Sequence, residues 1–314
     1  MADELVCQRT CGPTAFPWGK LSCAQHMGRR RTQEDRFSVS ACLRQDDPRS
    51  VFLGVWDGTV GDFASDQVMS LVLPHTLGSA AWREYAGKAA PAAQDAGAQQ
   101  LLAAAVAEGY ARADAELLEK CAEARNNYAS TTAVTALISG GVLTVAHLGD
   151  SKIALGSVDA QGQLVGQALT TDHKPDTDAE RARIEGAGGS VEYLTGSHYK
   201  PFIRGGDFVT RKAGGDKPMQ LQYSRAFGGK DLKPFGLSAT PDVTQVVLQP
   251  QHRVLVLATD GLWDVCSPED AVAIAMHACG SGADPAEALV RFALDDQNGS
   301  DNVTVVVMEL AASE

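Results

Sequence analysis

Residues 51 to 58 read Val-Phe-Leu-Gly-Val-Trp-Asp-Gly, an apolar run that ends on an aspartate and a glycine. An uninterrupted apolar run of this length predicts a short strand that is buried on both faces. A carboxylate at the end of such a strand needs a cation or a hydrogen-bond partner, because a buried charge without one is costly. Asp57 is therefore a candidate metal ligand. The dipeptide taken alone is also explained by an Asp-Gly turn with a solvated side chain.

The composition describes a large globular protein with an acidic surface. The chain has 314 residues, of which 44% are hydrophobic, so it can bury the core of one large domain or two small ones. Lys and Arg number 27 against 39 Asp and Glu, which gives a formal charge of −12. This charge disfavours a nucleic-acid partner, because it repels the phosphate backbone, but it suits the binding of divalent cations.

The cysteines and the apolar segments indicate the cellular setting. The seven cysteines form no Cys-x-x-Cys pair and no cluster at zinc-binding spacing, which favours reduced thiols. The N-terminus has no signal-peptide pattern, and no apolar stretch approaches the roughly 18 residues of a membrane span. We therefore expect a cytoplasmic or nuclear protein without membrane contact. We also expect a monomer.

Apolar runs and helical periodicity predict the secondary structure. Runs rich in Val, Leu and Thr predict strands at Val51–Trp56, Thr131–Ser139, Gly141–Leu148, Lys152–Val158, Val254–Ala258 and Val303–Leu310. Helical patterns occur at Phe63–Leu77, Gln99–Ala124, Thr177–Ala187, Pro268–Ala278 and Pro285–Leu294. Strands in runs, with helices grouped between them, predict an α+β fold in which packed sheets are covered by helices.

Two segments lack such patterns. Residues 79–98, rich in Ala, Gly and Gln, are predicted to form a loop. Residues 188–229 are Gly-rich and polar, and a structureless loop of that length is unusual inside a domain. This second segment is therefore predicted to form a small flap over a site, and its His198 is a residue that could approach a substrate.

Carboxylates recur where the predicted strands begin or end. They are Glu34 with Asp35, Asp57, Asp150, Asp260 with Asp264, and Asp301. A convergent cluster of this kind would repel itself by several kcal/mol unless cations neutralised it. Ligands made only of oxygen favour Mg²⁺ or Mn²⁺, and a carboxylate shared by two ions about 3.5–4 Å apart makes a bridging water nucleophilic. The sequence therefore predicts a single convergent carboxylate cluster that suits these ions.

These carboxylates lie in motifs that occur in the same order in one known family. The motifs are Arg30-Arg-Thr-Gln-Glu34-Asp35, Gly54-Val-Trp-Asp57-Gly58, Ala129-Ser-Thr-Thr-Ala-Val134, Leu148-Gly-Asp150-Ser-Lys152, Asp172-His-Lys-Pro175, Ser224-Arg-Ala-Phe-Gly228, Asp260-Gly-Leu-Trp-Asp264 and Gly299-Ser-Asp301-Asn302. Through them the chain, from about Leu21 to Leu310, resembles the metal-dependent serine/threonine protein phosphatases of type 2C, the PPM family.

The resemblance implies a fold and a division of the chain. The fold would be a central antiparallel β-sandwich flanked on both faces by α-helix pairs, with a metal cleft at one end and the flap near it. Residues 1–20 would be an N-terminal extension. Residues 21–314 would be the catalytic domain, with the flap at about 188–229.

The resemblance also assigns roles to the carboxylates. Asp57 would bridge two ions, which would be Mg²⁺ or Mn²⁺. Asp260 and Asp301 would complete one ion site. Glu34 and the carbonyl oxygen of Gly58 would contribute to the other.

Two further carboxylates and one arginine have roles in the same pattern. Asp150 and Asp264 would hold a weaker third ion. Arg30, four residues before Glu34 as the pattern requires, would bind the substrate phosphate through its planar guanidinium group. The alternative for the basic triplet Arg29–Arg31 is a solvated face or a nuclear-import signal.

The sequence departs from the family pattern beside Asp57. Thr59 stands where the family usually carries a histidine, which protonates the leaving alkoxide. Loss of a general acid typically costs on the order of 10²–10⁴ in rate. Val60 stands where glycine or alanine is usual, so it adds bulk beside the cleft.

The expected function is that of a metal-dependent phosphatase. It would hydrolyse phosphoserine and phosphothreonine in phosphoprotein substrates by attack of the metal-bridging water. Thr59 and Val60 motivate an alternative, a pseudophosphatase that binds phosphoproteins or a regulator with weak turnover or none. A metal-dependent nuclease would share the ligands but conflicts with the negative charge.

Three other histidines and one cysteine are expected to be structural. His26 and His147 lie in apolar surroundings, which is typical of core histidines with satisfied hydrogen bonds. His173 is expected to stabilise the start of the helix that follows it. Cys266 is expected to be a buried and inert thiol.

Overall fold

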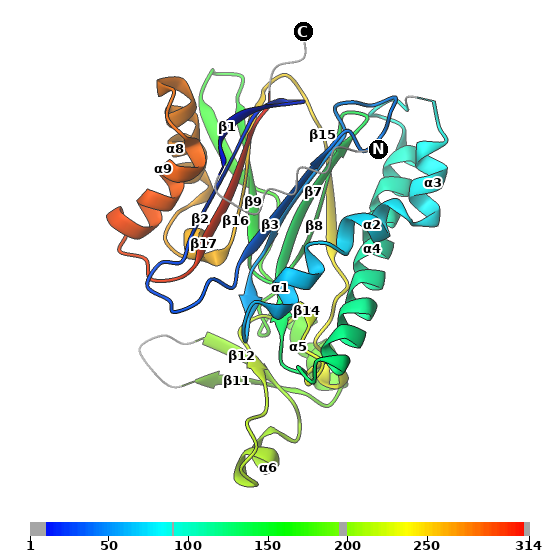
Figure 1. Cartoon of the computed structure of the whole chain (residues 1–314), viewed down its shortest axis with the longest axis vertical. Coiled ribbons are helices and arrows are strands. Elements are labelled where there is room, and N and C mark those ends of the chain that lie inside the picture. The colour runs from blue at the N-terminus through cyan, green and yellow to red at the C-terminus, as the bar shows by residue number, and fades with distance from the viewer. Residues whose placement is uncertain (1–10, 90, 195–199, 311–314) are drawn as a thin grey trace.

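Two antiparallel sheets face each other at the centre of the molecule (Figure 1). A computed structural model describes them and covers residues 11–89, 91–194 and 200–310. The strand order of the six-stranded sheet is β1 (Cys11–Phe16), β2 (Gly19–His26), β17 (Val303–Glu309), β16 (His252–Ala258), β9 (Lys152–Val158) and β10 (Leu164–Ala168). The strand order of the five-stranded sheet is β15 (Asp242–Val247), β8 (Val142–Leu148), β7 (Ala133–Ser139), β4 (Val51–Trp56) and β3 (Arg36–Ala41). The predicted α+β sandwich is confirmed.

Strand β4 lies between two hydrophobic cores. Val51, Leu53 and Val55 pack into the core between the two sheets. Phe52 and Trp56 point the other way and pack into the core beneath the helices. Because successive side chains of a strand point to opposite faces, a strand between two cores needs a continuous apolar run. Each fully buried side chain of this kind contributes about 1.5–3 kcal/mol.

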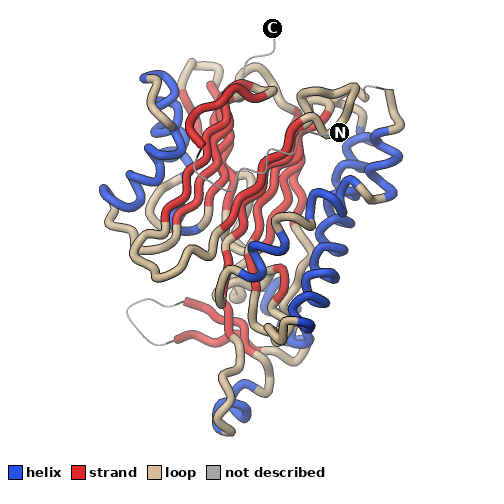
Figure 2. The backbone as a smooth tube through the Cα atoms, in the orientation of Figure 1, coloured by secondary structure: helices blue, strands red, loops and turns tan. Residues whose placement is uncertain are grey.

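Helices cover the outer face of each sheet (Figures 1 and 2). The helices over the five-stranded sheet are α1 (Phe63–Val68), α2 (Val72–Leu77), α3 (Ala80–Ala86) and α4 (Ala96–Glu123). The helices over the six-stranded sheet are α7 (Asp260–Trp263), α8 (Pro268–Ser281) and α9 (Pro285–Arg291). Among the described residues, no helix combines the length and apolar character that a bilayer span requires.

Helix α3 lies inside residues 79–98, which the sequence analysis assigned to a loop, so that prediction was wrong. The Ser79 hydroxyl caps the helix by accepting a hydrogen bond from the backbone N–H of Trp82. Trp82 and Tyr85 bury their side chains against the five-stranded sheet and α4. With seven residues, the helix is too short for a helical period to stand out in the sequence.

The predicted helix over Phe63–Leu77 also differs from the structure. The single helix predicted over Phe63–Leu77 is divided into α1 and α2. Pro74 explains the division, because proline fits the first turn of a new helix but not the interior of a continuous one. Part of the predicted extension, residues 1–20, pairs with β2 as strand β1.

The segment 188–229, predicted as a flap, contains its own small sheet beyond one end of the sandwich (Figure 1). Its elements are β11 (Ser190–Leu194), β12 (Lys200–Arg204), β13 (Gln220–Leu221) and α6 (Phe208–Ala213). Ile203, Leu221 and Tyr223 pack there against Ile184 of α5 (Asp178–Gly186). His198 lies outside the described residues.

Gly54 interrupts the apolar run of β4 because no side chain fits there. A Cβ atom at this position would lie 2.6 Å from the Trp56 side chain and 2.9 Å from the Ser38 hydroxyl oxygen. We expect Gly54→Ala to lower the free energy of unfolding by about 1–3 kcal/mol in urea denaturation. Gly186→Ala is the matched control, because no atom lies within 4 Å of its Cβ position. It should be neutral or stabilise by up to about 1 kcal/mol, and equal losses in both variants would contradict the packing argument.

Candidate active site

The predicted carboxylates meet at one end of the sandwich because of how the strands are paired. Asp57 follows β4 and Asp260 follows β16. Asp301 precedes β17, which runs antiparallel to β16, so the end of one strand lies beside the start of the other. Asp150 lies where the chain crosses from β8 in one sheet to β9 in the other, and Glu34 lies just before β3.

One pocket of about 520 Å³ brings these residues together. The residues assigned from the resemblance that line it are Arg30, Glu34, Asp57, Gly58, Asp150, Asp260, Asp264 and Asp301. Lys174 and Asn302, which lie in the quoted motifs without an assigned role, also line it, as do Lys200, Phe202, Leu221 and Tyr223. Most of these residues come from the flap and the segment before it, and nothing in the local sequence links them to Asp57.

Burial and mutual repulsion make Asp57 and Asp260 costly to ionise. Burial is the main cause that raises the pKa of Asp57 well above its ordinary value, and the charges of Asp260, Asp35, Asp150 and Asp301 raise it further. Burial and neighbouring carboxylates raise the pKa of Asp260 in the same way. Cations among these groups would remove the repulsion, and the donor set is all oxygen. The residues present therefore fit hard divalent cations.

Hydrogen bonds and close packing hold Glu34 at the pocket wall. Its Oε1 accepts a hydrogen bond from the Thr32 hydroxyl at 2.8 Å, and its Oε2 accepts one from the backbone N–H of Gly61 at 2.8 Å. A Cβ atom on Gly58 would lie 2.4 Å from the carbonyl oxygen of Glu34. Only glycine therefore fits where β5 (Gly58–Thr59) passes this segment.

Asp35 fastens the segment of Glu34 to the sheet. Its side chain is buried and accepts hydrogen bonds from the hydroxyl groups of Thr259 at 3.0 Å and Thr304 at 2.8 Å. Burial raises the pKa of Asp35 to about 7, although both hydrogen bonds act to lower it. Because Thr259 follows β16 and Thr304 lies in β17, Asp35 holds three chain segments in register at the pocket.

Arg30 forms an ion pair with a predicted metal ligand. Its Nη2 lies 2.6 Å from Oδ2 of Asp301, and the Arg30 side chain is 60% exposed. An ion pair this exposed is worth only about 0–1 kcal/mol. The pair is therefore easily exchanged, and a cation on Asp301 would leave the guanidinium group of Arg30 available to an anion.

Two lysines neutralise the carboxylates assigned to a third ion. Lys174 Nζ lies 2.6 Å from Oδ2 of Asp150, and Lys200 Nζ lies 3.9 Å from Oδ2 of Asp264. Burial opposes the charge of Lys174, but the attraction of Asp150 outweighs it and raises the pKa of the ammonium group. A positive charge is thus already present at this position, and a third ion would compete with it.

The two departures from the family pattern line the pocket wall. The Thr59 hydroxyl oxygen lies 2.7 Å from the Tyr223 hydroxyl oxygen. Val60 has a φ of 64°, and the residue is 53% exposed. A β-branched residue at positive φ is strained, at a cost on the order of 1–3 kcal/mol.

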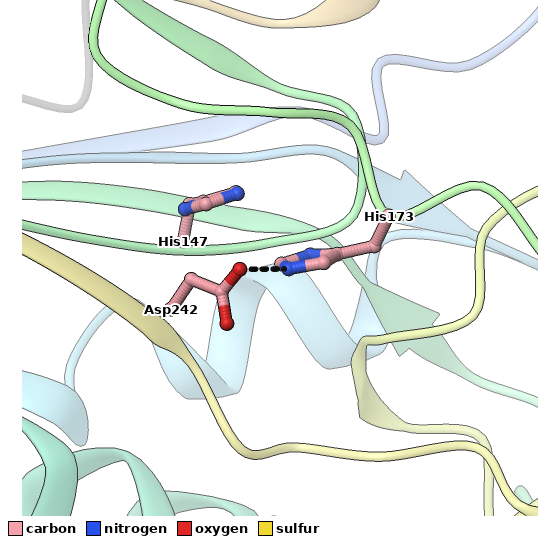
Figure 3. Close-up of side chains that lie close together, drawn as sticks. All are labelled: His147, His173 and Asp242. Carbon is pink, nitrogen blue, oxygen red and sulfur yellow. Dashed lines mark ion pairs between the residues drawn. The ribbon is translucent and has the colours of Figure 1, made fainter. Parts of the chain in front are cut away.

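A cluster of ligand-type side chains outside the pocket consists of His147, His173 and Asp242 (Figure 3). The two imidazole rings stack with centroids 4.4 Å apart, and His173 Nε2 lies 3.2 Å from Oδ2 of Asp242. His173 Nδ1 accepts a hydrogen bond from the backbone N–H of Gly149, so Nε2 carries the proton of the neutral ring. In this neutral form Nε2 offers no lone pair to an ion.

The predictions for the histidines and for Cys266 have mixed outcomes. His147 is buried and donates from Nε2 to the carbonyl oxygen of Thr171, so the predicted core histidine is confirmed. Cys266 is buried, as predicted. The prediction for His173 was wrong, because it fastens the turn before Asp150 rather than the next helix. The prediction for His26 was also wrong, since its side chain is exposed.

Comparisons with known proteins point to one family. A sequence model described as protein phosphatase 2C matches residues 20–302. A crystal structure of a serine-threonine phosphatase 2C from Toxoplasma gondii is 47% identical, with a TM-score of 0.93, and the match covers 98% of this chain and 99% of that one.

Curated plant relatives are more distant and longer. A probable protein phosphatase 2C from Arabidopsis thaliana is 34% identical over 80% of this chain, which spans 56% of that relative's length. A probable mitochondrial member from Oryza sativa is 32% identical over 93% of this chain, which spans 69% of its length.

The strain at Val60 predicts a stabilising substitution. We expect Val60→Gly to raise the free energy of unfolding by about 1 kcal/mol in urea denaturation, because glycine adopts positive φ without a steric cost. The matched control is Val209→Gly in α6, where the valine is 77% exposed. It should destabilise by up to about 1 kcal/mol, since glycine is unfavourable in a helix. A loss of stability in both variants would contradict the strain.

The buried histidine pair predicts a loss of stability in mild acid. Burial, with the charges of His147 and Arg225, lowers the pKa of His173 to about 4, although Asp242 acts to raise it. The unfolded chain, with an ordinary histidine pKa of about 6.5, binds the proton more readily than the folded one. Stability from this group is therefore complete above pH about 6.5 and falls, by about 1–3 kcal/mol, as the pH drops toward 4.

His173→Asn isolates this contribution, because the amide oxygen can still accept from Gly149 but cannot take up a proton. Urea denaturation between pH 4 and 7 should show a smaller loss of stability for the variant than for the unchanged protein. Parallel pH curves would show that His173 is not the group responsible.

Proposed function

The chain belongs to the protein phosphatase 2C family, and we propose that it hydrolyses phosphoserine and phosphothreonine in protein substrates with divalent cations. The observation that carries the proposal is the convergence of Glu34, Asp57, Asp260 and Asp301 in one pocket. Their repulsion has no structural benefit unless cations are to be held there.

The proposed ion sites follow the family pattern. Asp57 would contribute to both ion sites, Asp260 and Asp301 would complete one of them, and Glu34 and the Gly58 carbonyl oxygen would contribute to the other. When bound, Mg²⁺ or Mn²⁺ would supply neutralising charge and an activated water for attack on phosphorus. The hydrogen bonds from Thr32 and Gly61 support the role of Glu34, because they fix the orientation of both its carboxylate oxygens.

A third ion is a weaker proposal. Asp150 and Asp264 would hold it, and both line the pocket. The ion pair between Lys174 and Asp150 opposes its binding, since the ammonium group already provides the positive charge. An ion at this position would therefore bind more weakly than the two at Asp57.

Arg30 is proposed to bind the substrate phosphate. Its exposed guanidinium lies at the pocket, beside Asp301, and its fork matches two phosphate oxygens. Asn302 positions the loop that carries it. The Asn302 amide donates to the carbonyl oxygens of Met27 and Thr32, each at 2.9 Å, and its Oδ1 accepts from the backbone N–H of Glu34 at 2.8 Å.

The alternative function is a pseudophosphatase that binds phosphoproteins or a regulator without efficient turnover. Thr59 in place of the usual histidine and the bulk of Val60 favour it. The retention of every carboxylate of the pattern favours an enzyme, because a phosphate-binding module would not need so many repelling charges.

Three finer points are proposals of the same kind. Residues 21–314 would act as the catalytic domain, and the extension would contribute strand β1. The flap at 188–229 would border the pocket, which Lys200 and Phe202 of the flap line. The protein would act as a monomer in the cytoplasm or nucleus. The composition supports that location, but one relative is named mitochondrial. Organelle fractionation would therefore decide between the compartments.

Phosphate release from a phosphothreonine peptide tests the proposed function. We expect turnover with Mn²⁺, none with EDTA, and a loss of at least about 10³-fold in Asp57→Asn, because the Asp57 carboxylate would help to hold both ions. Asp178→Asn is the matched control, since Asp178 is exposed on α5 outside the pocket. An inactive but folded protein that binds Mn²⁺ would instead support the pseudophosphatase.

A further inference from the structure

Thr59 is part of a chain of three hydroxyl groups that runs from the protein interior to the pocket. Its Oγ1 lies 2.7 Å from the Tyr223 hydroxyl oxygen, which lies 3.4 Å from Oγ of Ser130. Thr59 and Ser130 are directly opposite each other on the paired strands β5 and β6 (Ser130–Thr131). Tyr223 reaches them from the part of the flap between β13 and β14 (Phe227–Gly228). The three side chains thus come from three separate parts of the sequence.

The direction of donation along this chain follows from the partners available. Ser130 is fully buried, and in the described part of the chain Tyr223 is the one hydrogen-bond partner that its hydroxyl contacts. If Thr59 donated to Tyr223 and Tyr223 to Ser130, the Ser130 proton would have no acceptor there. The opposite direction, from Ser130 to Tyr223 to Thr59, gives every buried hydroxyl proton an acceptor. It leaves the Thr59 proton free to point into the pocket.

Tyr223 is suited to this role because it stays protonated. Burial is the main cause that raises its pKa well above the ordinary value of a phenol, and nearby carboxylates raise it further. Its ring is anchored in the small core of the flap with Ile203 and Leu221, which restricts where its hydroxyl can lie. A buried, anchored donor of this kind fixes the rotation of the Thr59 side chain.

We propose that Tyr223 is a positioning residue that holds the Thr59 hydroxyl as a hydrogen-bond donor to the leaving oxygen of the phosphorylated serine or threonine. The inference rests on the proposed phosphatase function. The bond between phosphorus and the side-chain oxygen breaks, and that oxygen keeps the electron pair. Thr59 stabilises the developing charge but keeps its own proton. Water, the second reactant, supplies the hydroxyl group to phosphorus and the proton to the alcohol.

Leaving-group dependence distinguishes this role from general support of the fold. An alkoxide leaves with nearly a full charge and needs the donor, whereas a nitrophenolate disperses its charge and does not. We expect Tyr223→Phe to lower kcat on a phosphothreonine peptide about tenfold, the size of one hydrogen bond to a developing charge. The kcat on p-nitrophenyl phosphate should change less than about twofold, and the KM of the peptide should not change.

Tyr110→Phe is the matched control. Tyr110 is fully buried, and its hydroxyl is bonded to Thr135 at 2.9 Å and to the carbonyl oxygen of Ala146 at 3.0 Å, outside the pocket. Its removal should leave the ratio of peptide to aryl turnover unchanged, even where stability falls. If the ratio also shifted in the control, the loss of peptide turnover in Tyr223→Phe would be explained by lost stability.

A double-mutant cycle with Thr59→Val tests whether Tyr223 acts through Thr59. Once the Thr59 hydroxyl is gone, Tyr223→Phe should cost no further peptide turnover, because the two residues act as one unit. Additive losses, or equal losses on peptide and aryl substrates, would overturn the inference while the phosphatase function stands. If the unchanged protein with Mn²⁺ hydrolyses neither substrate, the proposed function fails and this inference fails with it.

Discussion

Like charges are gathered at one end of this protein, and its hydrophobic cores are what hold them there. Strand β4 belongs to two cores at once, so its end is rigidly placed, and the antiparallel pairing of β16 with β17 brings two more carboxylates to the same end. Burial then raises the pKa of Asp57 and Asp260 well above ordinary values. The packing of the sandwich therefore supplies the free energy that holds these mutually repelling carboxylates together in the pocket.

The sequence was informative wherever one property is repeated along a short segment. The apolar runs of β4 and β9 predicted both strands with the bounds that the structure shows, and the carboxylates at strand ends predicted the lining of the pocket. Helix α3 was missed because two turns are too few for a period. The division between α1 and α2 was missed because apolar periodicity outweighed the single proline, Pro74.

The sequence grouped the expected site residues, but it did not predict which side chains pair directly across long sequence separations. Tyr223 lies 164 residues from Thr59 and Asp301 lies 271 residues from Arg30, so no local pattern connects either pair. The ion pair between Lys174 and Asp150 was not predicted either, because nothing near a lysine in a loop indicates that it will face a buried aspartate. These contacts result from tertiary packing, so only the structure shows which side chains pair with the expected ligands in the pocket.

The ion pair between Arg30 and Asp301 would couple the two proposed binding events, that of an ion at Asp301 and that of phosphate at Arg30. One guanidinium group cannot pair fully with the carboxylate and a phosphate at the same time, so an ion bound to Asp301 would also free Arg30 for the proposed anion. Thermodynamic linkage makes the effect reciprocal: whatever factor the ions add to phosphate affinity, phosphate must add to ion affinity. The pocket would thus tend to fill or empty as a whole, and its occupancy would depend on both ligands more steeply than on either alone.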